Sequence, residues 1–267
     1  MPRHQHGGRI KNGAFMQIVE MKDRSLSALF SLIESQPGDY RHIFRGQCNA
    51  EWGLVPSLYR VQNPAIGGGT LEQNYDYFET AWVQRFFDEG LPYLPTLPRS
   101  YSNDRILAQH FGVPTRFMDW SRDPLVAAFF ATEDQSDADA AIFMILPDAH
   151  YLPEQVKTLG PHKAISVTPP AIDRRIPAQK SMFTFHPYGE PTAPFVPLDQ
   201  RPDMGNRITT TTGIARGFAK IVIPMRIKRH LHGTLLSMGY DRRNLFPGLD
   251  GVGADIGARA RSGSMPH

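Results

Sequence analysis

Proline and glycine interrupt this chain often, with 23 residues of each type among 267. Because proline ends helices and glycine favours turns, such a chain is expected to form short helices and strands joined by irregular connections. The hydrophobic share of 41% and the charged share of 21% are those of an ordinary globular protein that can bury a sizeable core. The sequence therefore predicts a globular fold built from many short elements.

Apolar residues at helical spacing predict four helices in the first half of the chain. These are expected over Ser25–Glu34, Leu71–Asp88 and Asn103–Phe111, with a fourth that opens at Asp123-Pro124. The helix over Leu71–Asp88 is expected to bury the face that carries its large apolar residues, which are Leu71, Tyr75, Phe78, Trp82 and Phe86.

Apolar runs predict strands, most of them later in the chain. The expected strands are His42–Gly46, Ala141–Leu146, Ile165–Thr168, Met182–Phe185 and Lys220–Pro224, and a helix over Ile227–Met238 follows the last of them. Since helices lead and strands dominate later, the fold class is expected to be α+β. We expect a single domain over residues 15–257, with an N-terminal helical part, a mixed or antiparallel sheet that carries the Arg-Gly strand, and mobile tails over residues 1–14 and 258–267.

Charge and cysteine content restrict the class of protein. The net charge of +3 and the isoelectric point of about 9.0 permit an anionic partner without requiring one. The single cysteine, Cys48, excludes a disulfide framework and a cysteine-based zinc site. No apolar run approaches the length needed to span a bilayer, and no signal-peptide pattern opens the chain. These features predict a cytoplasmic protein that does not use a membrane.

Several familiar chemistries lack their motifs here. The chain has no phosphate-binding G-x-x-x-x-G-K-[ST], no G-x-G-x-x-G, no H-E-x-x-H and no G-x-S-x-G. The close histidine pairs, His4/His6 and His230/His232, do not form a convincing ligand set, so no metal is predicted. A nucleophilic pair of Cys48 with a histidine has no local signature.

The segment Phe44–Arg60 concentrates polar, aromatic, glycine and proline residues. Its Arg45 stands in an otherwise apolar strand, where an arginine is costly unless its guanidinium has a partner. The partner is either a core carboxylate such as Asp119 or a phosphate or pyrophosphate, which the forked guanidinium suits.

The segment Gln109–Ala131 has the same character. Ser121 and Asp123 precede an apolar helix and are suited to cap it, while a helix N-terminus beside Ser121, Arg122 and Thr115 also suits an anion. His110 is either a general acid or base near Asp119 or a histidine satisfied within the core.

These segments resemble the motifs of the FRG domain family, which is named for the tripeptide Phe44-Arg45-Gly46. Gln109-His110-Phe111-Gly112-Val113-Pro114-Thr115-Arg116, with Asp119-Trp120-Ser121, is similar to the second motif of the family. Arg174-Arg175 with Ala178-Gln179, and Leu245–Gly251, resemble later blocks, so the likeness spans about residues 40–256. It departs at Phe117 and Met118, where leucine is usual, and at Lys180-Ser181, where a Gln/Gly-type pair is expected. The resemblance implies a bacterial or phage-associated protein.

A weaker likeness links the chain to ADP-ribosyltransferases, through an aromatic-Arg-Gly strand and a serine before an Ala-x-Phe helix. It implies NAD as a substrate and an effector of toxin or phage-defence type that modifies nucleic acid or protein. The implied catalytic residues are Arg45, His110, Asp119, Ser121 and Gln179. The implied cofactor-binding residues are Phe44, Arg45, Gly46, Gln47, Thr115, Trp120 and Ser121, with Trp120 or Phe44 stacking on nicotinamide.

The glutamate that ADP-ribosyltransferases generally use is missing from the matching block, which offers Gln179, and Glu190 lies a few residues on. Two other interpretations therefore stay open. One is a nuclease or nucleic-acid-binding module that uses Arg45, Arg116, Arg122 and His110, and the other is a non-catalytic interaction domain. An antitoxin or accessory protein is a further possible partner.

Overall fold

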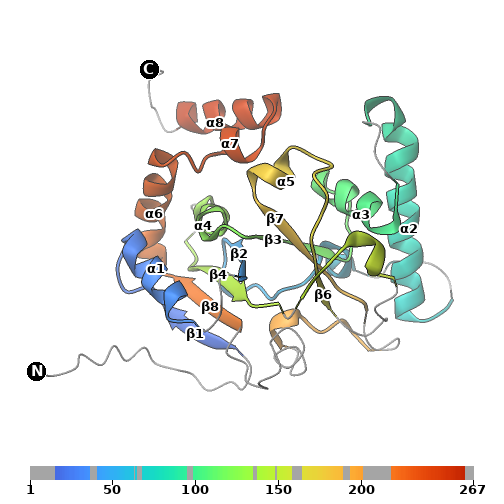
Figure 1. The fold of residues 1–267 in the computed structure, drawn as a ribbon, viewed down its shortest axis with the longest axis horizontal. Helices are drawn as coiled ribbons and strands as arrows, with labels where there is room; N and C mark the ends of the chain where they lie inside the picture. The colour runs from blue at the N-terminus through green and yellow to red at the C-terminus, as the bar shows by residue number, and fades with distance from the viewer. Residues whose placement is uncertain are drawn as a thin grey trace, which may run out of the picture.

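The computed structural model describes residues 16–36, 41–62, 64, 68–94, 99–134, 137–147, 149–157, 164–188, 193–200 and 218–261. The predicted tail over residues 1–14 and Glu190 lie outside these residues. The described residues form one α+β body around a mixed eight-stranded sheet, which confirms the predicted fold class (Figure 1). No described helix is long and apolar enough to cross a bilayer.

The sheet has the strand order β1-β8-β4-β2-β3-β7-β6-β5. Its neighbours are antiparallel except for the outer pairs β1–β8 and β5–β6, which are parallel. The strands are β1 (Gln17–Glu20), β2 (Ile43–Gln47), β3 (Phe117–Ser121), β4 (Ala140–Ile145), β5 (His150–Tyr151), β6 (Ile165–Val167), β7 (Ser181–Phe185) and β8 (Phe218–Ile223). The five predicted strands are present, whereas β1, β3 and β5 were not predicted as strands.

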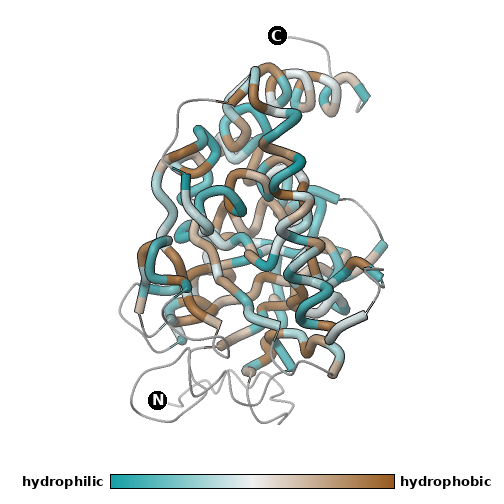
Figure 2. The backbone as a smooth tube through the Cα atoms, turned by 90° about the vertical axis from the view of Figure 1, so that its right-hand side faces the viewer, coloured by the Kyte–Doolittle hydropathy of each residue, from teal (hydrophilic) through white to brown (hydrophobic). Residues whose placement is uncertain are grey.

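Helices pack on the sheet and at its ends. They are α1 (Leu26–Glu34), α2 (Leu71–Gly90), α3 (Tyr101–His110), α4 (Pro124–Thr132), α5 (Arg175–Ala178), α6 (Met225–Ser237), α7 (Arg242–Leu245) and α8 (Leu249–Arg261). Figure 1 shows α1 and α6 on one side of the body, α2 and α3 on the other, and α7 with α8 at one end. Figure 2 shows brown and teal alternating along the helices, as expected for elements with one buried face.

The C-terminal helix α8 corrects a sequence expectation. It continues through Arg261, so the first residues of the expected tail over 258–267 are helical, and residues 262–267 lie outside the described part. Its glycines, among them Gly251 and Gly253, lower helix propensity and hid the helix from the sequence. Gly251 is needed where it stands, because a Cβ there would lie 1.9 Å from the carbonyl oxygen of Phe246.

Helix α2 was predicted correctly, but the expected buried face was wrong. Its buried residues are Glu79, Val83 and Phe87, while Leu71 and Trp82 are exposed. The face is therefore rotated by about one residue from the one that the apolar pattern favours. The cause is Glu79, which has no exposed surface and pairs with two arginines from other elements.

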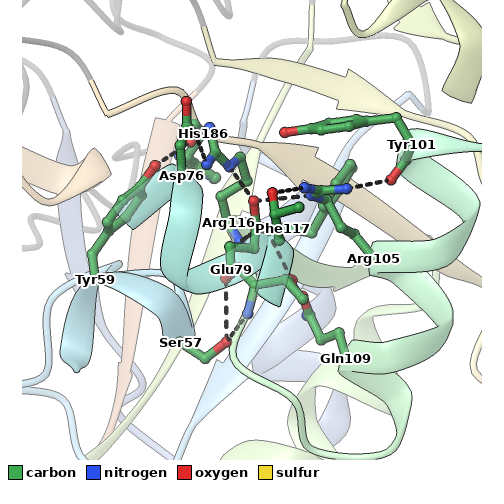
Figure 3. Close-up of polar contacts among 12 residues, drawn as sticks. Ser57, Tyr59, Asp76, Glu79, Tyr101, Arg105, Gln109, Arg116, Phe117 and His186 are labelled. Atoms are coloured by element: carbon green, nitrogen blue, oxygen red, sulfur yellow. Dashed lines mark hydrogen bonds and ion pairs between the residues drawn. The ribbon is translucent and has the colours of Figure 1, made fainter. Parts of the chain in front are cut away.

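These charges form a buried network between α2, α3 and β3 (Figure 3). Glu79 Oε2 accepts hydrogen bonds from Arg105 Nε at 2.9 Å and from Arg116 Nε at 2.7 Å. Glu79 Oε1 accepts the backbone N–H of Arg116 at 2.8 Å, and Arg116 also pairs with Asp76. The network ties α2 and α3 to the start of β3, and so holds the end of α3 beside the strand that carries Asp119.

Candidate functional site

The sheet opens between its two central strands. In the described part of the chain, β2 pairs with β3 at one position only, Phe44 with Ser121. On their other sides, β2 pairs with β4 and β3 pairs with β7 along the whole of each strand. A cavity of about 730 Å³ lies at the opening and is lined by residues of both strands. This volume is within the range of small-molecule and cofactor sites.

Arg45 of β2 reaches across the opening. Its Nη1 donates a hydrogen bond to the backbone oxygen of Asp119 at 2.7 Å and lies 3.7 Å from Asp119 Oδ2. Its Nε is buried and has no hydrogen-bond partner among the described residues. Burial lowers the pKa of Arg45 and Asp119 opposes this decrease, yet an arginine stays charged at neutral pH. The predicted contact with Asp119 is therefore present, and it leaves one buried donor unused.

The carboxylate of Asp119 is held from its other side by a chain of hydrogen bonds. Its Oδ1 accepts from Gln109 Nε2 at 2.6 Å, and Gln109 Oε1 accepts from the Thr115 hydroxyl. The backbone N–H of Thr115 donates to Ser57 Oγ at 3.1 Å. Because its carbonyl end is occupied by Thr115, Gln109 is oriented to donate to Asp119.

Thr115 differs from the other predicted cofactor-binding residues. It is fully buried and is not among the residues that line the cavity. Its hydroxyl donates to Gln109 Oε1 instead, so Thr115 orients Gln109 and does not itself line the cavity.

His110 ends α3 at the wall of the cavity, with 6% of its side chain exposed. Its Nδ1 lies 3.9 Å from Asp173 Oδ1, and its buried Nε2 makes no hydrogen bond within the part of the chain that the structure describes. Burial lowers the pKa of His110, while Asp119 and Asp173 oppose the decrease. The imidazole is therefore neutral at pH 7 and able to accept a proton.

This lowered pKa predicts a dependence of stability on pH. The unfolded chain binds a proton at His110 near the ordinary value of 6.5, whereas the folded chain binds it at lower pH. Stability is therefore present above 6.5 and is lost as pH falls through the folded-state pKa, by about 1.4 kcal/mol for each unit between the two pKa values. In urea titrations on both sides of this window, His110→Asn should lose less stability than wild type.

The exposed His230 of α6 supplies the matched control, since His230→Asn should keep the wild-type pH dependence. Equal pH dependence in wild type and His110→Asn would contradict the prediction. Residual pH dependence in His110→Asn is expected, because burial also lowers the pKa of His150 and His232.

Ser121 and Gln179 form another wall of the cavity. Ser121 Oγ donates to the backbone oxygen of Gln179 at 2.7 Å and accepts the backbone N–H of Asp123 at 2.9 Å. Asp123 in turn caps α4 by accepting the N–H of Leu125 at 2.9 Å, so the predicted capping role is confirmed. Gln179 Nε2 donates to the backbone oxygen of Leu245 at 2.9 Å. Both side chains are thus engaged in holding β3, β7 and the C-terminal segment together.

Lys180 stands where the family resemblance leads one to expect a different residue type. Its φ is +47°, in the left-handed region that favours glycine. Its Nζ pairs with Asp123 Oδ2 at 2.7 Å, and this ion pair helps to offset the strain beside the α4 cap.

The remaining predicted residues line the cavity in different ways. Phe44 and Trp120 are 5% and 3% exposed, and Trp120 Nε1 donates to Thr184 Oγ1 at 2.7 Å, so Trp120 is largely a core residue. Gln47 and Gly46 complete the β2 wall. The lack of a side chain at Gly46 lets α4 lie directly on β2, because a Cβ there would meet the Ala127 carbonyl oxygen at 1.9 Å.

The structure adds cavity residues that the sequence prediction missed. They are Cys48, Glu51, Trp52, Gly53, Val55, Arg60, Gln109, Val126, Ala127, Phe130, Glu133, Arg175 and Phe246. Trp52 is 55% exposed and offers a more accessible aromatic face than Trp120. Trp52 and Arg60 lie inside the first motif and Phe246 inside the closing block, whereas nothing local marks Glu133, which tertiary packing brings to the cavity.

Cys48 is not an activated nucleophile in this structure. Its Sγ donates to the backbone oxygen of Phe130 at 3.1 Å, and burial raises the pKa of the thiol. The described residues also contain no group of three or more His, Cys, Asp or Glu side chains placed to hold a metal.

Arg116 bears on the nucleic-acid interpretation. It is 6% exposed and its guanidinium is occupied by Glu79 and Asp76, so it is not available to a phosphate. The charged residues that line the cavity include three arginines and three carboxylates, which are Arg45, Arg60, Arg175, Glu51, Asp119 and Glu133. Such a balanced wall differs from the excess of positive charge typical of nucleic-acid sites.

Comparison with known proteins gives one match. The family model described as the FRG domain matches residues 40–140. This range holds β2, β3, α4 and the two motifs that meet at the cavity, while Arg175, Gln179 and Phe246 lie beyond it. No curated protein and no solved structure matches the chain.

Proposed function

Residues 40–140 of this chain match the FRG domain, and we propose that the cavity binds NAD and cleaves the bond between nicotinamide and ribose, so that ADP-ribose is transferred to an acceptor. The observation that carries the proposal is Arg45, which lines a cavity of about 730 Å³ and whose Nε makes no hydrogen bond to the described residues. Buried polar groups in proteins are almost always hydrogen-bonded, so this guanidinium has donor capacity left for a ligand oxygen. A pyrophosphate supplies such oxygens in the geometry that arginine prefers.

The balance of charge in the cavity supports the same ligand. NAD carries an anionic pyrophosphate and a cationic nicotinamide ring, so it needs both arginines and carboxylates around it. Arg60 lines the cavity beside Arg45, and no carboxylate among the described residues pairs with it. Asp119 presents its carboxylate on the same wall, with 55% of its side chain exposed.

Asp119 and His110 provide the groups that the reaction requires. When the glycosidic bond breaks, its electron pair leaves with the nicotinamide nitrogen, and positive charge develops on the ribose. The Asp119 carboxylate, fixed by Gln109, stabilises that charge. The acceptor O–H or N–H then bonds to the ribose carbon, and its proton passes to the neutral imidazole of His110, which lines the cavity. On this proposal, Asp119 supplies the acid that the sequence block around Gln179 lacks.

Thermal unfolding with and without NAD tests the proposal. At about 100 times its Kd, NAD should stabilise the wild type by about 2.7 kcal/mol, which corresponds to an increase in Tm of roughly 5 °C. Arg45→Lys should remain folded and lose most of this shift, because a lysine lacks the forked donors. Arg85→Lys, at an exposed arginine of α2 paired with Glu89, is the matched control and should keep the shift.

Release of nicotinamide, followed by chromatography, tests the chemical step separately. Asp119→Asn should keep the NAD-dependent increase in Tm and lose release by a factor of about 100 or more, the usual size for one electrostatic group. The absence of an NAD shift in wild type, or an equal shift in Arg45→Lys, would contradict the proposal. The acceptor, expected to be a nucleic acid or a protein, and the antitoxin or accessory partner stay predictions.

A further inference from the structure

A second group of residues from α4 and the C-terminal segment also lines the cavity. Phe130, in the last turn of α4, and Phe246, just after α7, both line the cavity. Their ring centroids are 5.9 Å apart and their planes are nearly perpendicular. Both rings are partly buried. Aromatic rings in a cavity wall provide apolar surface on which a planar base packs.

Glu133 follows Phe130 by three residues and therefore lies on the same side of the helix end. It also lines the cavity. The guanidinium of Arg242 pairs with Glu133 Oε1 and lies 5.3 Å from the centre of the Phe246 ring. Among the described residues, no other side chain makes a hydrogen bond or ion pair with this carboxylate. A carboxylate accepts about four hydrogen bonds, so Glu133 keeps capacity for a ligand.

The positions of Arg45 and Cys48 along the chain indicate how far this group lies from Asp119, beside which the glycosidic bond would break. Arg45 contacts Asp119, and Cys48, three residues further along, donates its Sγ–H to the Phe130 backbone oxygen. Cys48 directly follows the end of β2 at Gln47, and three residues of extended chain cover about 10 Å. Two riboses joined by a pyrophosphate can span such a separation, with the pyrophosphate beside Arg45.

We propose that the group formed by Phe130, Glu133, Arg242 and Phe246 binds the adenosine end of the dinucleotide, and that Glu133 selects a free ribose diol over a 2′-phosphorylated ribose. This inference rests on the proposed function. A carboxylate accepts hydrogen bonds from the two hydroxyls of a diol, whereas it repels a phosphate at the same position. The Phe130 and Phe246 rings provide the wall against which the base packs. Arg242 holds Glu133 in place.

Binding of unreactive fragments tests this selection directly. Isothermal titration would compare ADP-ribose, 2′-phospho-ADP-ribose and nicotinamide mononucleotide, which lacks the adenosine. Wild type should bind ADP-ribose at least about tenfold more tightly than its 2′-phosphorylated form, as expected for loss of a hydrogen bond to a charged group. Glu133→Gln should bring this ratio close to one and leave the affinity for nicotinamide mononucleotide unchanged.

Two further variants complete the experiment. Glu89→Gln removes an exposed carboxylate that is paired with an arginine on α2, and it should keep the wild-type ratio. Arg242→Gln leaves the Glu133 charge without its partner, so discrimination against the 2′-phosphate should increase. These two variants and the wild-type ratio keep the test decisive if Glu133→Gln does not fold.

The outcomes separate this inference from the proposed function. Equal wild-type affinities for ADP-ribose and its 2′-phosphorylated form, or an unchanged ratio in folded Glu133→Gln, would overturn the assignment of Glu133 and leave the NAD proposal standing. If wild type binds neither ADP-ribose nor nicotinamide mononucleotide, both proposals fail.

Discussion

Replacing Gly46 with alanine should destabilise the protein by about 3 kcal/mol or more, the upper range for inserting an atom into a packed core. The added Cβ would lie 1.9 Å from the carbonyl oxygen of Ala127 and 2.6 Å from the backbone nitrogen of Ala131. Both atoms belong to the backbone of α4, so no side chain can rotate to make room. Either α4 must move away from β2, or the sheet must distort beside the cavity.

Urea and thermal unfolding of Gly46→Ala measure this loss. Gly233→Ala is the matched control, because Gly233 lies inside α6 and a Cβ there meets no atom within 4 Å. The control should be neutral or stabilising by about 0.5–1 kcal/mol, since alanine favours a helix over glycine. Similar unfolding midpoints for the two variants would show that α4 does not depend on the close approach at Gly46.

The second large effect is expected at Glu79. Glu79→Gln keeps the size of the side chain and removes its charge, which leaves the buried guanidinium of Arg105 without a carboxylate and that of Arg116 with Asp76 alone. Removing one partner of a buried ion pair typically costs about 3–5 kcal/mol. The expected decrease in Tm is roughly 10 °C.

Glu89→Gln is again the matched control, since it breaks an exposed ion pair on the same helix. Exposed pairs contribute about 0.2–1 kcal/mol, so its unfolding midpoint should stay close to wild type. A loss of stability at Glu79 no larger than at Glu89 would mean that the network in Figure 3 contributes little to folding. A large loss would show that the end of α3, with Gln109 and His110, depends on this network for its position.

Much of the fold could be predicted because its signals are local. Apolar runs predict strands without reference to other segments. An example is Ala140–Ile145, whose six residues are all buried. Asp123-Pro124 marks the start of α4 by cap chemistry alone. The buried face of α2 was not predictable in this way, because Glu79 is buried only through arginines that lie 26 and 37 residues further along the chain.

The candidate site likewise contains residues that local patterns predict and residues that only tertiary packing places there. Of the ten predicted site residues, all but Thr115 line one cavity, and most of these come from the two dense motifs that include the adjacent strands β2 and β3, whereas Gln179 comes from a later block. Thr115 belongs to the same motif, but its side chain turns into the core toward Gln109. Glu133 could not be singled out, because its cavity position depends on Arg242 and Phe246, which follow it by more than 100 residues.

The sequence by itself determined the α+β class, most helices and strands, and the two motifs that carry Arg45 and Asp119, because these depend on periodicity, caps and residue types within short windows. Only the tertiary structure decided that β2 and β3 separate after a single pair, that Arg45 keeps an unused buried donor there, and that Glu133 faces the same cavity. These features arise from packing between segments far apart in the chain, where the energy of a buried charge depends on partners that no local pattern records.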